Sequence, residues 1–479
     1  MAPVDNMPHP RFVALLAAPV VVIGSPAMAQ NPSDAELAQE VIELRKAVAA
    51  LQSRLNDLEA SAAKAADAPV STAAPQAPAP QAPAPQMTRQ ASAATPPSQL
   101  PPRDTIGDQQ TGVARPDTRP PPNDPDLKGY IPIPGTETMV KLGGFAKVNA
   151  IYDFRPAGNP RTFVTSSIPV DAGDARNSKL DANATRFSFD VRRPSSLGPL
   201  RFYLENDFYG SNGGTAFRLR QAHGQVGNTY AGYGYSAFMD ADASPETLDD
   251  EGPNGSAFAR TTAIRQIWKI GGGATATLSL EDPDSQLTLP ATWDGTQPAP
   301  DLVGALRWEG KRGHWQASAV ARNLGYSDGR RDESAFAYGL NVAGLVTIYG
   351  DFLMAGLTYG DGIARYFNDL GGLGYDGVVE PDGKIRPLKA YGGYLAYTHH
   401  WSPKWRSNLV GSALVLERDD LLVPTAFRSS GYGALNLIWA VSPNFTVGVE
   451  ALYGRHELQN GRDADVTRLQ ASLKYDLVR

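Results

Sequence analysis

From about residue 127 onward, apolar and polar residues alternate in short stretches, which clusters of glycine, aspartate, asparagine and proline separate. In the last stretch every second residue is apolar: Leu469, Ala471, Leu473, Tyr475 and Leu477. A period of two indicates β-strands with one apolar face, and repeated stretches of about ten residues are typical of transmembrane barrels. A soluble β-sandwich would alternate too, but it would turn its apolar face inward. The pattern therefore predicts an all-β fold, a transmembrane antiparallel β-barrel over residues 127–479.

The connections between these stretches also favour a membrane barrel. Those at 402–404 and 442–444 are tight, whereas 417–427 and 455–465 are longer and polar. Short turns at one end and long loops at the other are typical of outer-membrane barrels. Aromatic residues gather near strand ends, where an interfacial girdle would lie: Tyr152, Phe154, Trp401, Trp405, Trp439 and Phe445. We expect about sixteen strands, although about eighteen would also fit, and a barrel of this width encloses an aqueous channel.

Ahead of the barrel, residues 30–65 have the pattern of a short α-helical coiled coil. Ser33 and Glu36 have the spacing of a helix capping box. Apolar residues follow at alternating intervals of four and three: Leu37, Val41, Leu44, Val48, Leu51, Leu55 and Leu58. Valine at a with leucine at d favours two strands, and the charges at g and e would pair in a parallel bundle of identical chains. The alternative is a single amphipathic helix on a surface, which would normally have a wider apolar stripe.

Two further segments complete the predicted organisation. Residues 1–29 resemble a secretory signal peptide, with an apolar run at 12–23 and a small-x-small cleavage pattern at 27–29. Residues 66–126 are rich in alanine, proline, glutamine, serine and threonine, so they predict a disordered, semi-stiff linker. We therefore expect the barrel in the outer membrane and the coiled coil in the periplasm.

Composition excludes several kinds of chemistry. The 479 residues include no cysteine, which excludes thiolate metal sites and cysteine nucleophiles. A formal net charge of −6 argues against a general nucleic-acid binder. The sequence has no H-E-x-x-H or phosphate-loop motif. We accordingly expect no enzymatic activity, no cofactor and no metal.

Arginines at the polar positions of predicted strands indicate how the pore is lined. Charged side chains facing lipid are costly, so these side chains should point into the lumen. Each could pair with an acid such as Asp190, Glu205 or Asp207 and merely stiffen the wall. Taken together, arginines outnumber these acids in the early strands, and rings of arginine favour the passage of anions. The predicted pore-lining residues are Arg186, Arg192, Arg201, Arg218, Arg220, Arg265, Arg307, Arg322 and Arg365.

Four short motifs resemble those of the DcaP-like trimeric outer-membrane porins: Lys141-Leu142-Gly143-Gly144-Phe145, Gly252-Pro253-Asn254-Gly255, Gly360-Asp361-Gly362-Ile363-Ala364-Arg365-Tyr366 and Ala390-Tyr391-Gly392-Gly393-Tyr394-Leu395. The resemblance spans roughly residues 130–479, and the heptad helix with its spacer is similar too. It implies a homotrimer of sixteen-stranded barrels that takes up small anionic solutes such as dicarboxylates. Outer-membrane lipid and lipopolysaccharide would surround such a trimer.

Two other functions remain open at this point. A sugar porin would guide its solutes along an aromatic track, to which Tyr203, Tyr209 and Tyr432 could contribute. The chain could also be mainly structural, with its coiled coil tethering the cell envelope. Arginine clusters on the inner wall would favour anions over sugars.

Overall fold

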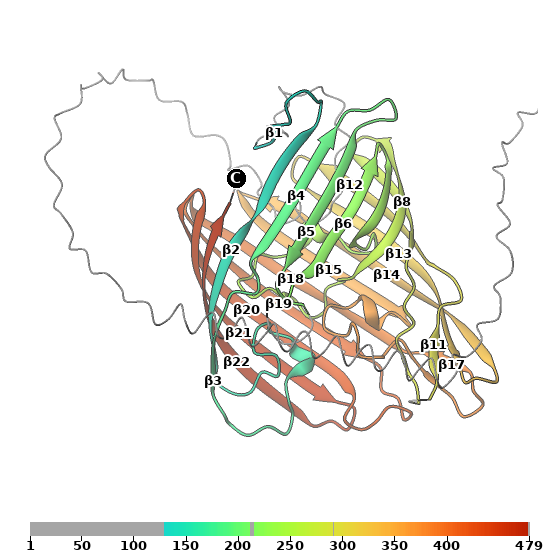
Figure 1. Ribbon diagram of the computed structural model, residues 1–479. Helices are drawn as coiled ribbons and strands as arrows, with labels where there is room; N and C mark the ends of the chain where they lie inside the picture. Colours follow the sequence, from blue (N-terminus) through green and yellow to red (C-terminus); the bar gives the residue numbers. More distant parts are fainter. Residues whose placement is uncertain (1–128, 211–214, 291, 478–479) are drawn as a thin grey trace, which may run out of the picture. The chain divides into compact units, whose positions relative to one another are not determined.

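The computed structural model describes residues 129–210, 215–290 and 292–477, which form a closed antiparallel β-barrel (Figure 1). The sheet contains 19 strands, of which β1 and β11 are short additions and β3 and β4 together form the second strand of the wall. Each wall strand pairs with the next along the chain, and β22 pairs with β2, which closes the barrel. The described residues thus build a wall of 16 strands, and the expected number is confirmed.

The wall consists of β2 (Met139–Asp153), β3 (Asn177–Asp181), β4 (Arg186–Arg193), β5 (Leu200–Asp207), β6 (Arg218–Val226), β7 (Thr229–Tyr235), β8 (Arg260–Gly271), β9 (Ala274–Glu281), β12 (Asp301–Gly310), β13 (Gly313–Ser327), β14 (Asp332–Ile348), β15 (Asp351–Asp361), β18 (Lys389–Ser402), β19 (Trp405–Leu416), β20 (Phe427–Ser442), β21 (Phe445–Leu458) and β22 (Asp463–Asp476). The shorter elements are β1 (Ile131–Pro132), β10 (Leu287–Thr288), β11 (Asp294–Thr296), β16 (Gly377–Val379), β17 (Ile385–Pro387), and the 3-10 turns η2 (Thr165–Ser167), η3 (Ala241–Ala243) and η4 (Ala364–Tyr366).

The alternation of side chains assigns one face of the wall to lipid and the other to the lumen. On β22, Leu469, Leu473 and Tyr475 are about half exposed on the outside, while Arg468 and Gln470 are buried on the inside. The remaining strands follow the same rule. In the described residues, no helix is long and apolar enough to cross a membrane.

The two ends of the barrel differ in the length of their connections. At one end the turns are short, such as 272–273, 311–312, 349–350, 403–404 and 443–444. At the other end lie the long connections 154–176, 236–259, 282–300 and 362–388. Most of the 7 tryptophans lie near the short turns, as an interfacial girdle requires: Trp268, Trp308, Trp315, Trp401, Trp405 and Trp439.

The expectation of a long loop at 455–465 is wrong. Strand β21 continues to Leu458 and β22 begins at Asp463, so only 459–462 connect them. The strands extend past the apolar band as a hairpin, where the outer side chains no longer need to be apolar. Polar residues on the outer face therefore mark the edge of the lipid layer. The hydrogen-bonded strands continue beyond that edge.

The apolar core lies inside the barrel, where long connections fold back against the wall. One cluster joins Phe238 of 236–259 to Tyr366, Phe367 and Leu370 of 362–388. Another packs Phe163 of 154–176 against the wall residue Tyr432, with ring centroids 6.1 Å apart. These connections therefore occupy much of the lumen. The predicted signal peptide (1–29), coiled coil (30–65) and linker (66–126) lie outside the described residues and stay predictions.

Buried ion pairs brace the wall from inside, and the deepest is centred on Arg468. Its guanidinium is fully buried and its Nε lies 2.6 Å from Oδ1 of Asp153 on β2. Its Nη2 donates to the carbonyl oxygen of Asn159 at 2.8 Å. One side chain thus ties β22 to β2, where the barrel closes, and to the connection 154–176.

We expect Arg468→Leu to destabilise the barrel by about 3–5 kcal/mol, because it leaves the Asp153 carboxylate buried without its partner. Arg455→Leu is a matched control, since Arg455 pairs with Asp463 on the surface of the neighbouring strands. It should cost at most about 1 kcal/mol. Denaturant unfolding in detergent, followed by tryptophan fluorescence, measures both. Equal losses of stability would contradict this account of the closure.

Candidate functional site

The connection 236–259 between β7 and β8 enters the lumen and is anchored to the opposite wall. Nζ of Lys147 on β2 lies 2.9 Å from Asp250, and the guanidinium of Arg406 on β19 pairs with Glu246 at 2.5 Å. Glu450 on β21 accepts the backbone N–H groups of Leu248 and Asp249 at 2.9 and 2.8 Å. The buried, charged residues of the wall therefore fix the course of this loop.

At Gly255 the backbone of the loop lies against the backbone of the wall. Its N–H donates to Oγ of Ser412 at 3.0 Å, and the neighbouring Asn254 amide donates to Oγ of Ser430 at 2.6 Å. A Cβ at Gly255 would overlap the carbonyl oxygen of Ala413 and lie 2.8 Å from the nitrogen of Gly393. Only glycine permits this approach, which gives the glycine pairs of the sequence a physical role.

Two other long connections meet this loop inside the barrel. The carboxylate of Asp369, in 362–388, accepts the Thr165 hydroxyl of 154–176 at 2.6 Å. The Asn368 amide donates to the carbonyl oxygen of Glu251 at 2.7 Å. Asp249 accepts the backbone N–H of Phe163 at 3.0 Å. The three connections thus form one hydrogen-bonded junction inside the barrel.

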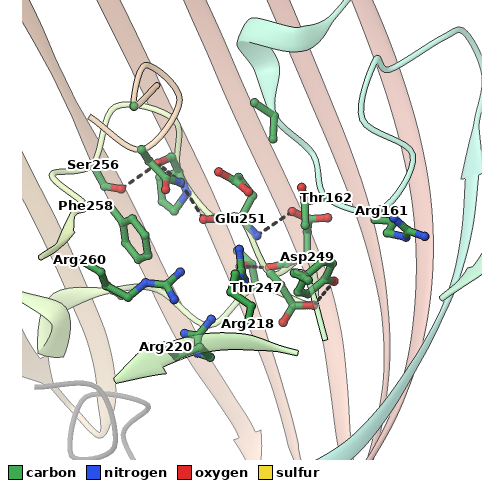
Figure 2. Close-up of a pocket in the computed structure, with 18 of the residues that line it drawn as sticks. Arg161, Thr162, Arg218, Arg220, Thr247, Asp249, Glu251, Ser256, Phe258 and Arg260 are labelled. Carbon is green, nitrogen blue, oxygen red and sulfur yellow. Dashed lines mark hydrogen bonds between the residues drawn. The ribbon is translucent and has the colours of Figure 1, made fainter. Parts of the chain in front are cut away.

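Beside this junction lies a cavity of about 730 Å³, with the loop on one side and the early strands on the other (Figure 2). Figure 2 shows Arg218, Arg220 and Arg260 gathered on one side of the view, with Asp249 and Glu251 on the loop facing them. The cationic residues that line the cavity are Lys147, Arg161, Arg186, Arg218, Arg220, Arg260, Arg365 and Lys474. The acidic ones are Glu246, Asp249, Asp250, Glu251 and Asp284. The lining therefore has a formal excess of positive charge.

Carboxylates of the wall hold two of the cavity arginines in place. Arg220 binds Glu205 at 2.7 Å and Asp207 at 3.0 Å, and it donates to the hydroxyl of Tyr235 at 2.8 Å. Arg218 binds the same Asp207 at 2.7 Å. These pairs fix the direction of each guanidinium and neutralise much of its charge.

Two other cavity arginines have no such acid. Among the described residues, no carboxylate lies within ion-pairing distance of Arg186 or Arg260. Arg186 lies over the ring of Phe145, 5.3 Å from its centroid, and its Nε is buried without a hydrogen-bond partner in the described part of the chain. Arg260 lies 5.4 Å from the ring centroid of Phe258 and 5.9 Å from that of Tyr235. Aromatic rings hold both guanidinium groups, and neither has an ion-pair partner among the described residues, although Arg186 still attracts the carboxylate of Asp250 from a greater distance.

The structure brings four of the nine predicted arginines to the cavity, namely Arg186, Arg218, Arg220 and Arg365. The other five point inward but brace the wall or its loops. Arg192 and Arg201 both bind Asp190, Arg265 binds Glu281, Arg307 binds Asp240 and Asp242, and Arg322 binds Asp301 and Asp376. Alternation in the sequence shows which side of the wall a residue faces, but not its height along the barrel.

Sequence reasoning missed Lys147, Arg161, Arg260 and Lys474, and it gave no role to the acids at 249–251. The length of the connection 236–259 was an available signal, because long loops inside compact domains are usually functional. The sequence gave no indication that Arg260 lines the cavity. Arg260 is the first residue of β8 and follows a loop, so the alternation of apolar and polar residues does not show which way its side chain points. The described residues contain no group of His, Asp or Glu side chains suited to a metal ion.

The acids of the loop differ in their electrostatic surroundings. Although burial opposes ionisation, the ammonium of Lys147 holds the pKa of Asp250 below its ordinary value. Burial raises the pKa of Asp249, and Arg468 opposes this shift from 3.7 Å. The two neighbouring carboxyl groups therefore ionise at different pH.

The chain is similar to known porins in both sequence and fold. Residues 127–476 match the family model described as the Porin subfamily. The solved outer membrane channel DcaP of Acinetobacter baumannii is similar, with 21% sequence identity over 72% of this chain and 99% of that chain and a TM-score of 0.66. The anion-selective porin from Comamonas acidovorans shares 12% identity over 71% of this chain and 100% of that chain, with a TM-score of 0.48. No curated protein sequence matches the chain. The resemblance seen in the sequence motifs is confirmed.

We expect Gly255→Val to detach the loop from the wall, because its side chain would overlap the backbone at Ala413 and Gly393. Overpacking of this kind costs about 1–3 kcal/mol. A protease added to the folded barrel should then cleave within 236–259 faster than in the unchanged protein. Gly411→Val is the control, since a side chain there meets open space. Equal cleavage rates in both variants would contradict the anchoring role of Gly255.

Proposed function

This chain belongs to the Porin subfamily, and from that premise we propose that it is an outer-membrane channel that prefers small anions. Solutes would cross the barrel through the cavity between the loop 236–259 and the wall formed by the early strands. In this proposal the family and the fold make the chain a channel rather than an enzyme.

The preference for anions rests on Arg186 and Arg260, the two cavity arginines that form no ion pair with a carboxylate of the described residues. A unit charge about 6 Å from a passing ion contributes ~0.7 kcal/mol in water, which changes ion occupancy about threefold. Arginines with a nearby acid contribute less, because the acid cancels most of their field. Arg186 and Arg260 should therefore contribute more to selectivity than the eight other arginines of the predicted set, each of which has an ion-pair partner.

The remaining cavity residues suit carboxylates in particular. Guanidinium groups bind carboxylates through two parallel hydrogen bonds, and the lining places several of them around one space. A solute with two carboxylates could contact two of these arginines during passage. This supports the small dicarboxylates that the family resemblance implies.

The sugar porin is supported less well. Of Tyr203, Tyr209 and Tyr432, only Tyr209 lines the cavity. Tyr203 donates to Glu205 in the wall at 3.1 Å, and Tyr432 is buried against Phe163. The three residues therefore do not form a continuous track.

The homotrimer, the periplasmic coiled coil and the lipid surroundings are part of the same proposal. The heptads at 30–65 would hold copies together on the periplasmic side, and the linker at 66–126 would separate them from the barrels. Gel mobility without heating, compared between the full chain and a deletion of 30–65, tests whether the barrels or the coiled coil hold the oligomer together.

We expect Arg186→Gln and Arg260→Gln each to lower the anion-to-cation permeability ratio about threefold, because each removes a positive charge that has no ion-pair partner among the described residues. The reversal potential across a potassium chloride gradient in planar bilayers measures this ratio. Arg192→Gln is the control, since Arg192 faces the lumen outside the cavity and shares Asp190 with Arg201. An unchanged ratio in both cavity variants, or an equal change in the control, would argue against the assignment.

Succinate should reduce the chloride current through the unchanged channel, and the double variant Arg186→Gln/Arg260→Gln should weaken this block. Maltose oligomers, tested at the same concentration, should have little effect. Block by the oligosaccharides without block by succinate would favour the sugar porin. A barrel that inserts but conducts no ions would favour the structural role.

A further inference from the structure

The junction of the three connections contains carboxyl groups that come from two of them. Asp249 and Glu251 lie on 236–259, and Asp369 lies on 362–388. Asp369 also accepts the Ser166 N–H at 3.2 Å, and Asp249 accepts the Glu251 N–H at 3.0 Å. Asp249 and Asp369 thus hold the connections together through backbone groups, and Asp249 and Glu251 line the cavity (Figure 2).

Glu251 differs from the other acids of its loop in its partners. Glu246 pairs with Arg406, Asp250 pairs with Lys147, and Asp249 lies 3.7 Å from Arg468. Among the described residues, no cation lies within ion-pairing distance of Glu251. One carboxylate oxygen each of Asp249 and Asp369 is also buried without a hydrogen-bond partner in that part of the chain. Thr162 forms a side-chain hydrogen bond with Glu251, which favours the ionised form. The carboxyl groups of the region otherwise have few donors, and Glu251 has no ion-pair partner among the described residues.

A shortage of donors favours the protonated acid. Burial and the neighbouring charges of Asp369 and Asp249 raise the pKa of Glu251 to about 8, and burial raises the pKa of Asp369 to about 6. A raised pKa means that Glu251 carries a proton and no charge below about pH 8, and a negative charge above it. Near neutral pH the loop is consequently less acidic than its sequence suggests.

The charged and titratable groups around Glu251 come from every element packed against it. Arg218 on β6 favours its ionisation, and Asp249 and Asp369 oppose it. Behind these lie Asp250 on the same loop and Arg468, Glu450 and Tyr432 on the wall. Arg218 is the only cation near enough to act directly on Glu251 among those named, and it is already bound to Asp207.

We propose that Glu251 determines the selectivity of the pore through its protonation. With its proton bound, Glu251 adds no negative charge to the cavity, and the excess of cationic residues in the lining favours anions. When the proton is released, a negative charge appears inside the same cavity and offsets part of the arginine field. It also repels Asp249 and Asp369, which weakens the junction that holds the loop. This inference rests on the proposed function, since it concerns the selectivity of the same cavity.

The test is the reversal potential of the full-length protein in zwitterionic phosphatidylcholine bilayers from pH 6 to pH 9. The anion-to-cation permeability ratio should fall about threefold as the pH rises through about 8, the effect of one unit charge in the cavity. Glu251→Gln, which imitates the protonated acid, should keep the ratio of low pH throughout. Glu251→Asp keeps a titrating carboxyl group and should retain a pH dependence. Gel mobility without heating verifies that both variants are folded.

Asp420→Asn is the control for loss of an acid elsewhere, because Asp420 is exposed on the connection 417–426 and should leave the pH dependence unchanged. An anion-selective channel whose ratio does not change with pH, or whose change persists in Glu251→Gln, would overturn the role of Glu251 alone. A channel that prefers cations at every pH would overturn the proposed function. If the permeability ratio of such a cation-preferring channel changed with pH in the unchanged protein but not in Glu251→Gln, Glu251 would still be the titrating group that sets selectivity, although the anion preference would be wrong.

Discussion

Backbone hydrogen bonding in a solvent without water is the constraint on which the rest of this structure depends. A strand in the hydrocarbon layer can satisfy its N–H and C=O groups only by pairing with neighbours on both sides, so the sheet must close. Here β22 returns to β2, and no strand edge remains in the wall. With 16 strands the enclosed space is too wide for side chains of the wall to fill. In this protein long connections occupy part of it.

The same constraint concentrates charge inside the barrel. Outer positions have to be apolar, so each charged residue of a membrane-spanning strand points into the lumen. Crowded together there, most guanidinium groups bind carboxylates, as Arg468 does with Asp153 and Arg322 with Asp301. Such pairs stiffen the wall and contribute little net field. The proposed selectivity depends on the few charges without an ion-pair partner, and of these Arg186 and Arg260 line the cavity.

The long connections turn this wide lumen into a defined cavity. A loop inside a wet barrel cannot be held by apolar contacts alone, and the wall supplies Lys147, Arg406 and Glu450 as polar anchors for 236–259. Glycine at position 255 lets the backbone of the loop lie against the wall. The position of the loop 236–259 and its charge are therefore coupled. Acids of this loop that line the cavity, such as Asp249, also belong to the junction that holds the loop in place.

The sequence by itself determined the class of fold, an approximate number of strands and the side of the wall that each strand residue faces. These properties depend on a period of two residues and on the cost of exposing charge to lipid, both of which act within one strand. Only the tertiary structure decided which arginines share a cavity, which of them have an acid, and where the loop 236–259 lies. Those outcomes depend on the register between strands and on contacts across the lumen, such as Glu450 with Leu248. Residues far apart in the chain make such contacts, and no local pattern records them.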